Sequence, residues 1–167
     1  MIKIRTKHPD GTDFGGIVLE NKRSFVIIQQ ITSFEPDGIV IIPKTWIKGI
    51  RNGKFEKCAN EIIRSILTNE GLVASGWHTE LNTLEAIMAH LKANNVWPAV
   101  EVLYNGDASF YIGPVIDILP NSFKIHSYDA SGKWEKKYEL EYKEVFKVEI
   151  NSSYVKNFNE YMQSKSA

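Results

Sequence analysis

With 167 residues, 43% of them hydrophobic and 24% charged, the chain is long enough for one well-buried domain or two small ones. Six Pro and 11 Gly are too few for a collagen-like or disordered chain, and a single cysteine, Cys58, excludes an intramolecular disulfide and a cysteine-rich zinc site. No apolar run approaches the roughly 20 residues that cross a bilayer, and the opening MIKIR holds no apolar signal core. We therefore expect a cytoplasmic protein without a membrane segment.

The formal net charge is zero, but the charges are unevenly spread. Residues 1–64 hold 11 Lys and Arg against 7 Asp and Glu, whereas residues 65–167 hold 9 against 13. This asymmetry gives the first half a weak attraction for anions, or lets the two halves face each other. It is too small to indicate nucleic-acid binding by itself.

Short runs rich in Val, Ile and Phe, separated by turns, fill the first part of the chain. Turns at intervals of about 8 to 12 residues are typical of a small antiparallel barrel or sandwich. Gly16 lies inside one of these runs, where a missing side chain permits the sharp bend that a small barrel needs. The predicted order is strand 2–5, turn 9–11, strand 14–18, strand 24–27, turn 36–38, strand 39–42, turn 43–45 and strand 47–50.

A helix over residues 54–67 is predicted to close this first part. Its apolar residues recur at helical spacing, and Gly71 suits the end of a helix. Because Cys58 lies on the apolar stripe, we expect its thiol to be buried and chemically quiet. The stripe consists of Phe55, Cys58, Ala59, Ile62, Ile63 and Ile66.

The middle of the chain is predicted to hold a linker and a second helix. Residues 70–81, with Gly71 and Gly76, have the composition of a linker. A helix over residues 83–93 must end before Trp97-Pro98, because the residue that precedes a proline avoids the helical region. A third helix is predicted over residues 154–162, after Ser152-Ser153, either of which can cap it.

The part of the chain that follows the second helix repeats the pattern of the first part at an offset of 97 to 99 residues. Gly113 corresponds to Gly16, and Pro114 directly after it marks an edge or a bulge. The matches are collinear over about 55 residues, which favours internal duplication over chance similarity between two β-rich segments. Corresponding segments are 2–5 and 100–103, 14–18 and 111–115, 24–27 and 122–125, 36–38 and 130–132, and 47–50 and 145–148.

This order of strands, turns and a glycine-bent strand resembles the Sm-like small β-barrel. The whole chain resembles a tandem pair of such barrels, as found in bacterial proteins of uncharacterised function. The resemblance implies a mainly β protein with helices (α+β), in which two tandem Sm-like antiparallel β-barrels are each followed by a helix and a further helix lies between them. The implied domains are 1–69, a first barrel with its closing helix; 70–95, a linker and helix; and 96–167, a second barrel with its C-terminal helix.

Sm-like proteins commonly bind RNA as rings, through an acidic-and-Asn loop motif and an Arg-Gly motif before the last strand. This chain departs from both motifs. The loop at residues 33–38 lacks the Asn, and Ile50-Arg51-Asn52-Gly53 follows the last predicted strand of the first barrel. No RNA-binding residue can therefore be carried over from the resemblance.

No pattern points to catalysis, a cofactor or a metal. The chain has no phosphate loop, nucleophile elbow or dinucleotide fingerprint. His78 and Glu80 match one half of a zinc-deaminase motif, but the Cys-x-x-Cys half is absent. We expect a non-enzymatic protein with no catalytic residue, no metal and no cofactor.

The candidate binding surface is basic and contains an aromatic residue: Lys44, Trp46, Lys48, Arg51, Lys54 and Lys57. Such residues can hold a phosphate backbone while a base stacks, but they also suit the solvated faces of a strand and a helix, with Trp46 in the core. Because the chain as a whole is neutral, we expect recognition of another protein, with oligomers allowed. The alternative is weak RNA or single-stranded DNA binding through the first barrel, for which replacing Lys48 and Arg51 by Glu would weaken binding and leave the fold intact.

Overall fold

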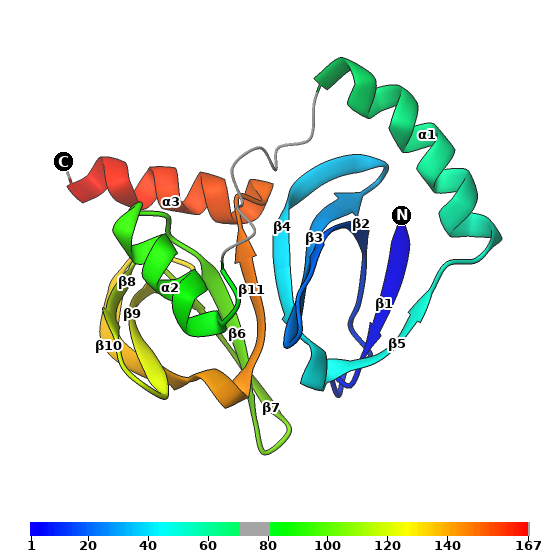
Figure 1. The fold of residues 1–167 in the computed structure, drawn as a ribbon. Helices are drawn as coiled ribbons and strands as arrows, with labels where there is room; N and C mark the ends of the chain where they lie inside the picture. Colours follow the sequence, from blue (N-terminus) through cyan, green and yellow to red (C-terminus); the bar gives the residue numbers. More distant parts are fainter. Residues whose placement is uncertain (71–80, 167) are drawn as a thin grey trace. The chain divides into compact units, whose positions relative to one another are not determined.

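The computed structural model describes residues 1–70 and 81–166. The chain divides into two compact units, Met1–Thr79 and Glu80–Ala167 (Figure 1). The linker predicted at residues 70–81, including His78, lies almost entirely outside the described residues.

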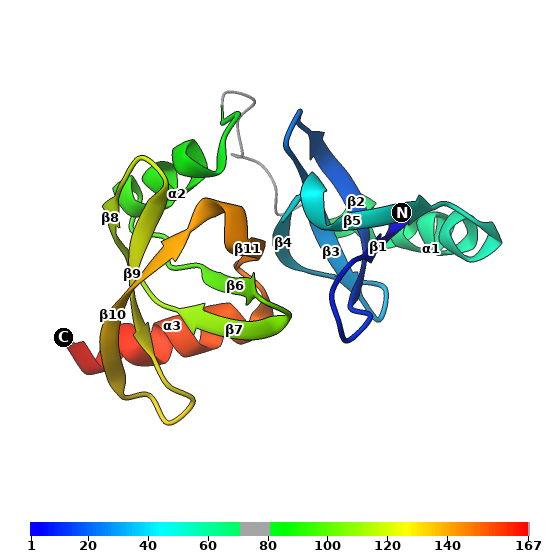
Figure 2. The same ribbon diagram turned by 90° about the horizontal axis from the view of Figure 1, so that it is seen from below.

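Five antiparallel strands form the sheet of the first unit in the spatial order β5-β1-β2-β3-β4. A short 3₁₀ helix, η1, precedes β5, and the long helix α1 follows it (Figure 2). The elements are β1 Ile2–Thr6, β2 Asp13–Asn21, β3 Phe25–Thr32, β4 Glu35–Pro43, η1 Lys44–Trp46, β5 Ile47–Arg51 and α1 Lys54–Glu70.

Strands β3 and β4 supply most of the core of this unit. Val26 pairs with Ile42 and Ile28 pairs with Val40, and these four side chains are at most 2% exposed. Branched side chains pack well on a pleated surface, which is why this β-branched sequence forms a stable hairpin.

Helix α1 buries only part of the predicted apolar stripe. Glu56, Ala59 and Ile63 are at most 1% exposed, and their spacing of three and four residues defines the buried face. Cys58 is exposed, so the prediction of a buried Cys58 is wrong. The neighbouring apolar stripe that faces solvent consists of Phe55, Cys58 and Ile62.

Six strands of the second unit form two separate sheets, with the spatial orders β11-β6-β7 and β10-β9-β8. The elements are α2 Leu84–Ala93, β6 Ala99–Tyr104, β7 Asp107–Ile112, β8 Val115–Ile118, β9 Ser122–Tyr128, β10 Trp134–Glu141, η2 Tyr142–Glu144, β11 Val145–Ile150 and α3 Ser153–Ser166.

The described strands are not arranged as closed barrels, so the prediction of two tandem Sm-like barrels is wrong. In the first unit, β5 is an edge strand of its sheet. In the second unit, the predicted bent strand is broken at Gly113-Pro114 into β7 and β8, which belong to different sheets. The ladder stops there because Gly113 has a φ of 148° and Pro114 has no N–H to donate. The observed architecture is α+β with open sheets.

Two helices cover the sheets of the second unit. Helix α2 lies against β8 and β9 (Figure 1), and its N-cap Thr83 accepts a hydrogen bond from the Ala86 N–H at 3.1 Å. Helix α3 lies on the side of the second unit opposite to α2 (Figure 2). It packs two of its residues into a core cluster formed by Ala99, Ile112, Tyr128, Val155 and Met162. No helix within residues 1–70 and 81–166 is long and apolar enough to span a membrane.

Gly16 and Gly113 occupy corresponding positions in the two units. A Cβ atom on Gly16 would overlap the carbonyl oxygen of Gln29, and one on Gly113 would overlap the carbonyl oxygen of His126. Both pairs are offset by 97 residues. In each unit, a strand therefore passes so close to the backbone of the next segment that only glycine fits.

Candidate functional site

Strand β5 divides the residues of the predicted basic surface into two groups. Lys44 and Trp46 lie in η1 and are half-buried, whereas Lys54 and Lys57 lie at the start of α1 and are exposed. Lys48 is exposed between them on β5. Because β5 has five residues at a rise of about 3.3 Å each, the two groups lie roughly 13 Å or more apart along the strand.

Arg51 is engaged in an ion pair within the first unit. Its Nε and one Nη donate to Oε1 of Glu56 at 2.9 and 2.6 Å, while the Gly53 N–H donates to Oε2 at 2.7 Å. The Arg51 hydrogen bonds hold the pKa of the Glu56 carboxyl below its usual range, against the opposite effect of burial. These bonds also draw the Glu56 side of α1 inward, which leaves Cys58 outside.

This pair corrects an expectation for Arg51. The Glu56 side chain is only 1% exposed, so a glutamate at position 51 would face a buried carboxylate. We therefore expect Arg51→Glu to destabilise the fold, and Arg51 is a structural residue as well as a surface one.

An apolar groove of about 290 Å³ lies beside β5 and is lined in part by Lys44. The pairing of β5 with β1 shifts by one residue next to Ile47, and this bulge brings Ile47 and Ile50 to the same groove. Ile50 is 56% exposed and Val18, which also lines the groove, is 40% exposed. Apart from Lys44, the only polar side chain that lines the groove within the described residues is Asn21.

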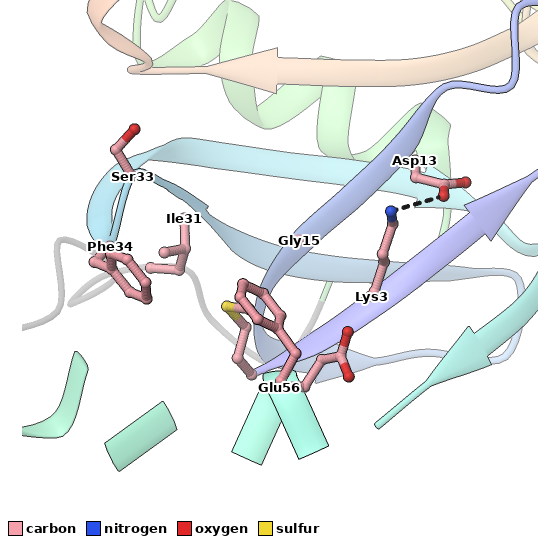
Figure 3. Close-up of a pocket in the computed structure, with 9 residues that line it drawn as sticks. Lys3, Asp13, Gly15, Ile31, Ser33, Phe34 and Glu56 are labelled. Carbon is pink, nitrogen blue, oxygen red and sulfur yellow. Dashed lines mark ion pairs between the residues drawn. The ribbon is translucent and has the colours of Figure 1, made fainter. Parts of the chain in front are cut away.

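A second concavity, of about 310 Å³, lies where α1 meets β1, β2 and β3 (Figure 3). We call it the Phe34–Phe55 pocket after the two aromatic residues in its lining. Gly15 on β2, which pairs with Lys3 on β1, forms the floor of this pocket. A Cβ atom added at position 15 would meet only the Ile31 carbonyl oxygen, at 4.0 Å. The missing side chain therefore opens the pocket and is not required by the backbone.

The hairpin between β3 and β4 places Phe34 at this pocket (Figure 3). Thr32 pairs with Glu35, so the turn is Ser33-Phe34, and residues 36–38, which were predicted as the turn, lie within β4. Ser33 and Phe34 have φ angles of 51° and 69°. Two-residue hairpin turns commonly have positive φ at both central residues and favour Asn and Gly there, so a bulky aromatic such as Phe34 is an uncommon choice for this turn.

The walls of the pocket are apolar and its rim is polar. Phe34 and Phe55 are 37% and 61% exposed, which is unusual for large aromatic side chains. On the rim, Lys3 Nζ forms an ion pair with Asp13 Oδ2 at 3.2 Å (Figure 3). The carboxylate of Glu56, which also lines the pocket, is neutralised by Arg51. Met1 also lines the pocket, and its N-terminal ammonium donates to Asn60 Oδ1 at 3.0 Å. With these charged groups engaged within the unit, the pocket suits an uncharged, bulky apolar group.

Sequence reasoning missed this pocket. Phe34 looked like a loop residue and Phe55 like a core residue, and Gly15 was not separated from Gly16. The usable signal was a large aromatic at a hairpin tip with no Gly or Asn beside it. Within the described part of the chain, no group of three or more His, Cys, Asp or Glu could hold a metal ion.

No protein-family model matches the chain, and neither a curated protein nor a solved structure matches it.

Proposed function

We propose that this protein is a non-enzymatic recognition protein whose first unit binds another protein by accepting one bulky apolar side chain in the Phe34–Phe55 pocket. The observation that supports this most directly is the Ser33-Phe34 turn. This turn places an aromatic ring, where Asn or Gly would suit the backbone better, beside an open pocket, and contact with a partner accounts for the exposed ring.

The pocket has the features of a protein-binding hot spot. Hot spots are dominated by aromatic residues around a small pocket that a partner side chain fills, with a polar rim that excludes water. Phe34, Phe55 and Ile31 form such an apolar surface, and the Lys3–Asp13 pair forms part of the rim.

The surrounding charge selects the type of partner. Lys54 directly precedes Phe55 on α1 and Lys57 follows one residue after Glu56, and both lysines are exposed. Complementary charge speeds encounter and sets orientation more than it adds affinity. On the hairpin side Glu35, directly after Phe34, is also exposed. The partner we propose therefore has a bulky apolar residue with acidic residues only on the side that faces α1.

Two observations weigh against the nucleic-acid alternative. Arg51, which would contact phosphate, is paired with Glu56, and Trp46, which would stack on a base, is half-buried. Phosphate binding needs several free cations along a backbone path, and stacking needs an exposed ring face. Of the predicted basic surface, Lys44, Lys48, Lys54 and Lys57 then remain for phosphate, and for this reason we favour protein binding over nucleic-acid binding.

The proposal is tested by selecting a displayed library of random peptides on the full chain, in parallel with the variant Gly15→Leu. Leucine at position 15 fills the floor of the pocket, and position 15 tolerates a side chain because φ is not positive and no atom is close. We expect selected peptides to share a large apolar residue with acidic neighbours, and to lose at least tenfold in affinity for Gly15→Leu.

The matched control is Gly15→Ala, which adds one methyl group and leaves most of the pocket open. Peptides that bind wild type and Gly15→Leu equally would contradict the proposal, as would a failure to select any peptide. A submicromolar, salt-sensitive affinity for single-stranded oligonucleotides that falls in Lys48→Glu and Lys54→Glu would replace it with nucleic-acid binding.

We further infer that the two units arose by duplication and that the protein acts in the cytoplasm. The order of 3₁₀ helix, last strand and closing helix is the same in both units, and the close approaches at Gly16 and Gly113 correspond. The single cysteine, exposed on α1, supports a reducing compartment.

A further inference from the structure

A small pocket in the second unit is surrounded by aromatic rings and carboxylates. It has a volume of about 170 Å³ and lies between the end of β7, the turn after β9 and the first turns of α3. Drug-sized ligands occupy sites of about 300 Å³ or more, so this space suits a compact head group. We call it the aromatic pocket; the residues that give it its chemistry are Phe110, Tyr128, Asp129, Glu135, Tyr154 and Phe158.

The rings form a connected set of walls. Tyr154 lies edge-to-face against Phe110, with ring centroids 6.2 Å apart, and tilted against Phe158 at 4.9 Å. Phe158 in turn stacks with Tyr128 at 6.2 Å. Phe110 and Tyr154 are 45% and 50% exposed, so ring surface stays open to a ligand. Three elements, β7, β9 and α3, thus present aromatic surface to one space.

The buried wall of the pocket is held rigidly. Tyr128 is 3% exposed, and its hydroxyl donates to Asn159 Oδ1 at 2.9 Å. The Asn159 side-chain amide then donates to the Trp97 carbonyl oxygen at 2.8 Å. This chain of hydrogen bonds fixes the Tyr128 ring before any ligand arrives, which lowers the entropy lost on binding.

Two carboxylates give the aromatic pocket a negative character. Asp129 Oδ1 accepts hydrogen bonds from the Ser131 hydroxyl at 2.7 Å, the Ser131 N–H at 2.8 Å and the Lys133 N–H at 3.0 Å. These bonds, the Ser131 hydroxyl above all, hold the pKa of the Asp129 carboxyl below its usual range, so it is charged at neutral pH. All three end on Oδ1, so this turn does not engage Oδ2.

The second carboxylate belongs to Glu135, at an irregular point of β10. Trp134 pairs with Tyr128 but Lys137 pairs with His126, so β10 has one extra residue between these pairs. A bulge of this kind re-aims a side chain and is common beside binding sites. Here it accompanies a carboxylate in the lining of an aromatic space, and this carboxylate also interacts with the Tyr138 hydroxyl.

We propose that the aromatic pocket binds a methylated ammonium group. The faces of aromatic rings are negative, and a quaternary ammonium has little water to lose, so rings and carboxylates together favour it over other groups. An anion would meet two carboxylates, and a neutral apolar group would gain nothing from them. This site lies in the other unit from the Phe34–Phe55 pocket and does not depend on the function proposed there.

The test is a calorimetric titration of the full chain with choline and with its neutral carbon isostere, 3,3-dimethyl-1-butanol. We expect saturable choline binding at least about tenfold tighter than that of the isostere, because only the cation gains from ring faces and carboxylates. Two further arms, a short peptide with trimethyl-lysine and the same peptide with lysine, identify the source of the group. A tighter trimethyl-lysine peptide indicates a modified protein, and tighter choline indicates a small molecule.

Variants keep the proposal falsifiable. Phe110→Leu keeps apolar surface but removes a ring face, so choline affinity should fall about fivefold, while Phe110→Tyr should retain it. Glu135→Gln should weaken choline without changing the isostere. The matched control is Tyr104→Leu, at an exposed aromatic on β6 that does not line the pocket. Equal affinity for choline and the isostere, no saturable binding, or an unchanged affinity in Phe110→Leu would overturn the proposal.

Discussion

Replacing Gly16 by alanine tests the close approach of β2 to β3. The new Cβ would overlap the Gln29 carbonyl oxygen and lie 3.1 Å from Cδ1 of Ile28 and 3.2 Å from the Gln29 carbonyl carbon. Ile28 and Gln29 are fully buried in β3, which pairs with β2 on one side and β4 on the other, so β3 cannot move away freely. Relief requires β2 to separate locally, which weakens one or two ladder hydrogen bonds at about 1 kcal/mol each and adds the strain of overpacking. We expect a loss of about 2–3 kcal/mol.

The assay is urea unfolding followed by circular dichroism. With a slope of about 1–3 kcal/mol/M, the midpoint of the transition that reports the first unit should fall by roughly 0.7–3 M in Gly16→Ala. Gly15→Ala is the matched control, because its Cβ meets nothing nearer than 4.0 Å and it restricts the unfolded chain, so it should be neutral or stabilising by up to about 1 kcal/mol. A Gly16→Ala midpoint within error of the wild type, or equal effects in both variants, would refute the reasoning.

Three further predictions concern single side chains. Because Cys58 is exposed, the native protein should react stoichiometrically with a thiol reagent without denaturant, and slow labelling that needs urea would contradict the observed helix face. Burial raises the pKa of Tyr142 to about 12, and among the described residues its hydroxyl has no hydrogen-bond partner. Tyr142→Phe should therefore be as stable as wild type or about 1 kcal/mol more stable. Because the unfolded chain loses the tyrosine proton from about pH 10, wild type loses stability above this pH, and Tyr142→Phe should lose less. Because Arg51 lowers the pKa of Glu56, the ion pair stabilises the fold above the usual glutamate pKa of about 4.3, and this contribution is lost as pH falls through the lowered pKa of the folded protein. The stability of Glu56→Gln should therefore depend less steeply on pH in acid than that of wild type. Identical acid unfolding profiles would argue against the pair.

Local patterns in the sequence predicted most strands and helices, but they did not predict whether the strands close into a barrel. Short β-branched runs became strands, and the apolar spacing of residues 54–67 became α1. Whether strands close into a barrel depends on long-range pairing, and a single backbone feature decided it in the second unit: Gly113-Pro114 was expected to bend a strand and instead ended one.

The rotation of α1 shows the same limit on a smaller scale. Six apolar residues cover more than one helical stripe, and periodicity alone does not say which stripe is buried. The choice was made by a polar residue, Glu56, through its bonds to Arg51 and Gly53. A glutamate three residues after a glycine, with an arginine just before, reads as surface charge in the sequence, and only the fold brings the three together. Family membership with the Sm-like proteins stays a prediction.

The edge position of β5 has a consequence for solubility. An unpaired strand at the margin of a sheet is a template on which another chain can add, and repeated addition leads to aggregates. Here the strand is only five residues long, carries a bulge and displays the charged Lys48 and Arg51. Shortness, irregularity and charge each interrupt the flat row of donors and acceptors that fibril growth requires. These features guard the β5 edge of the open sheet against the addition of another strand.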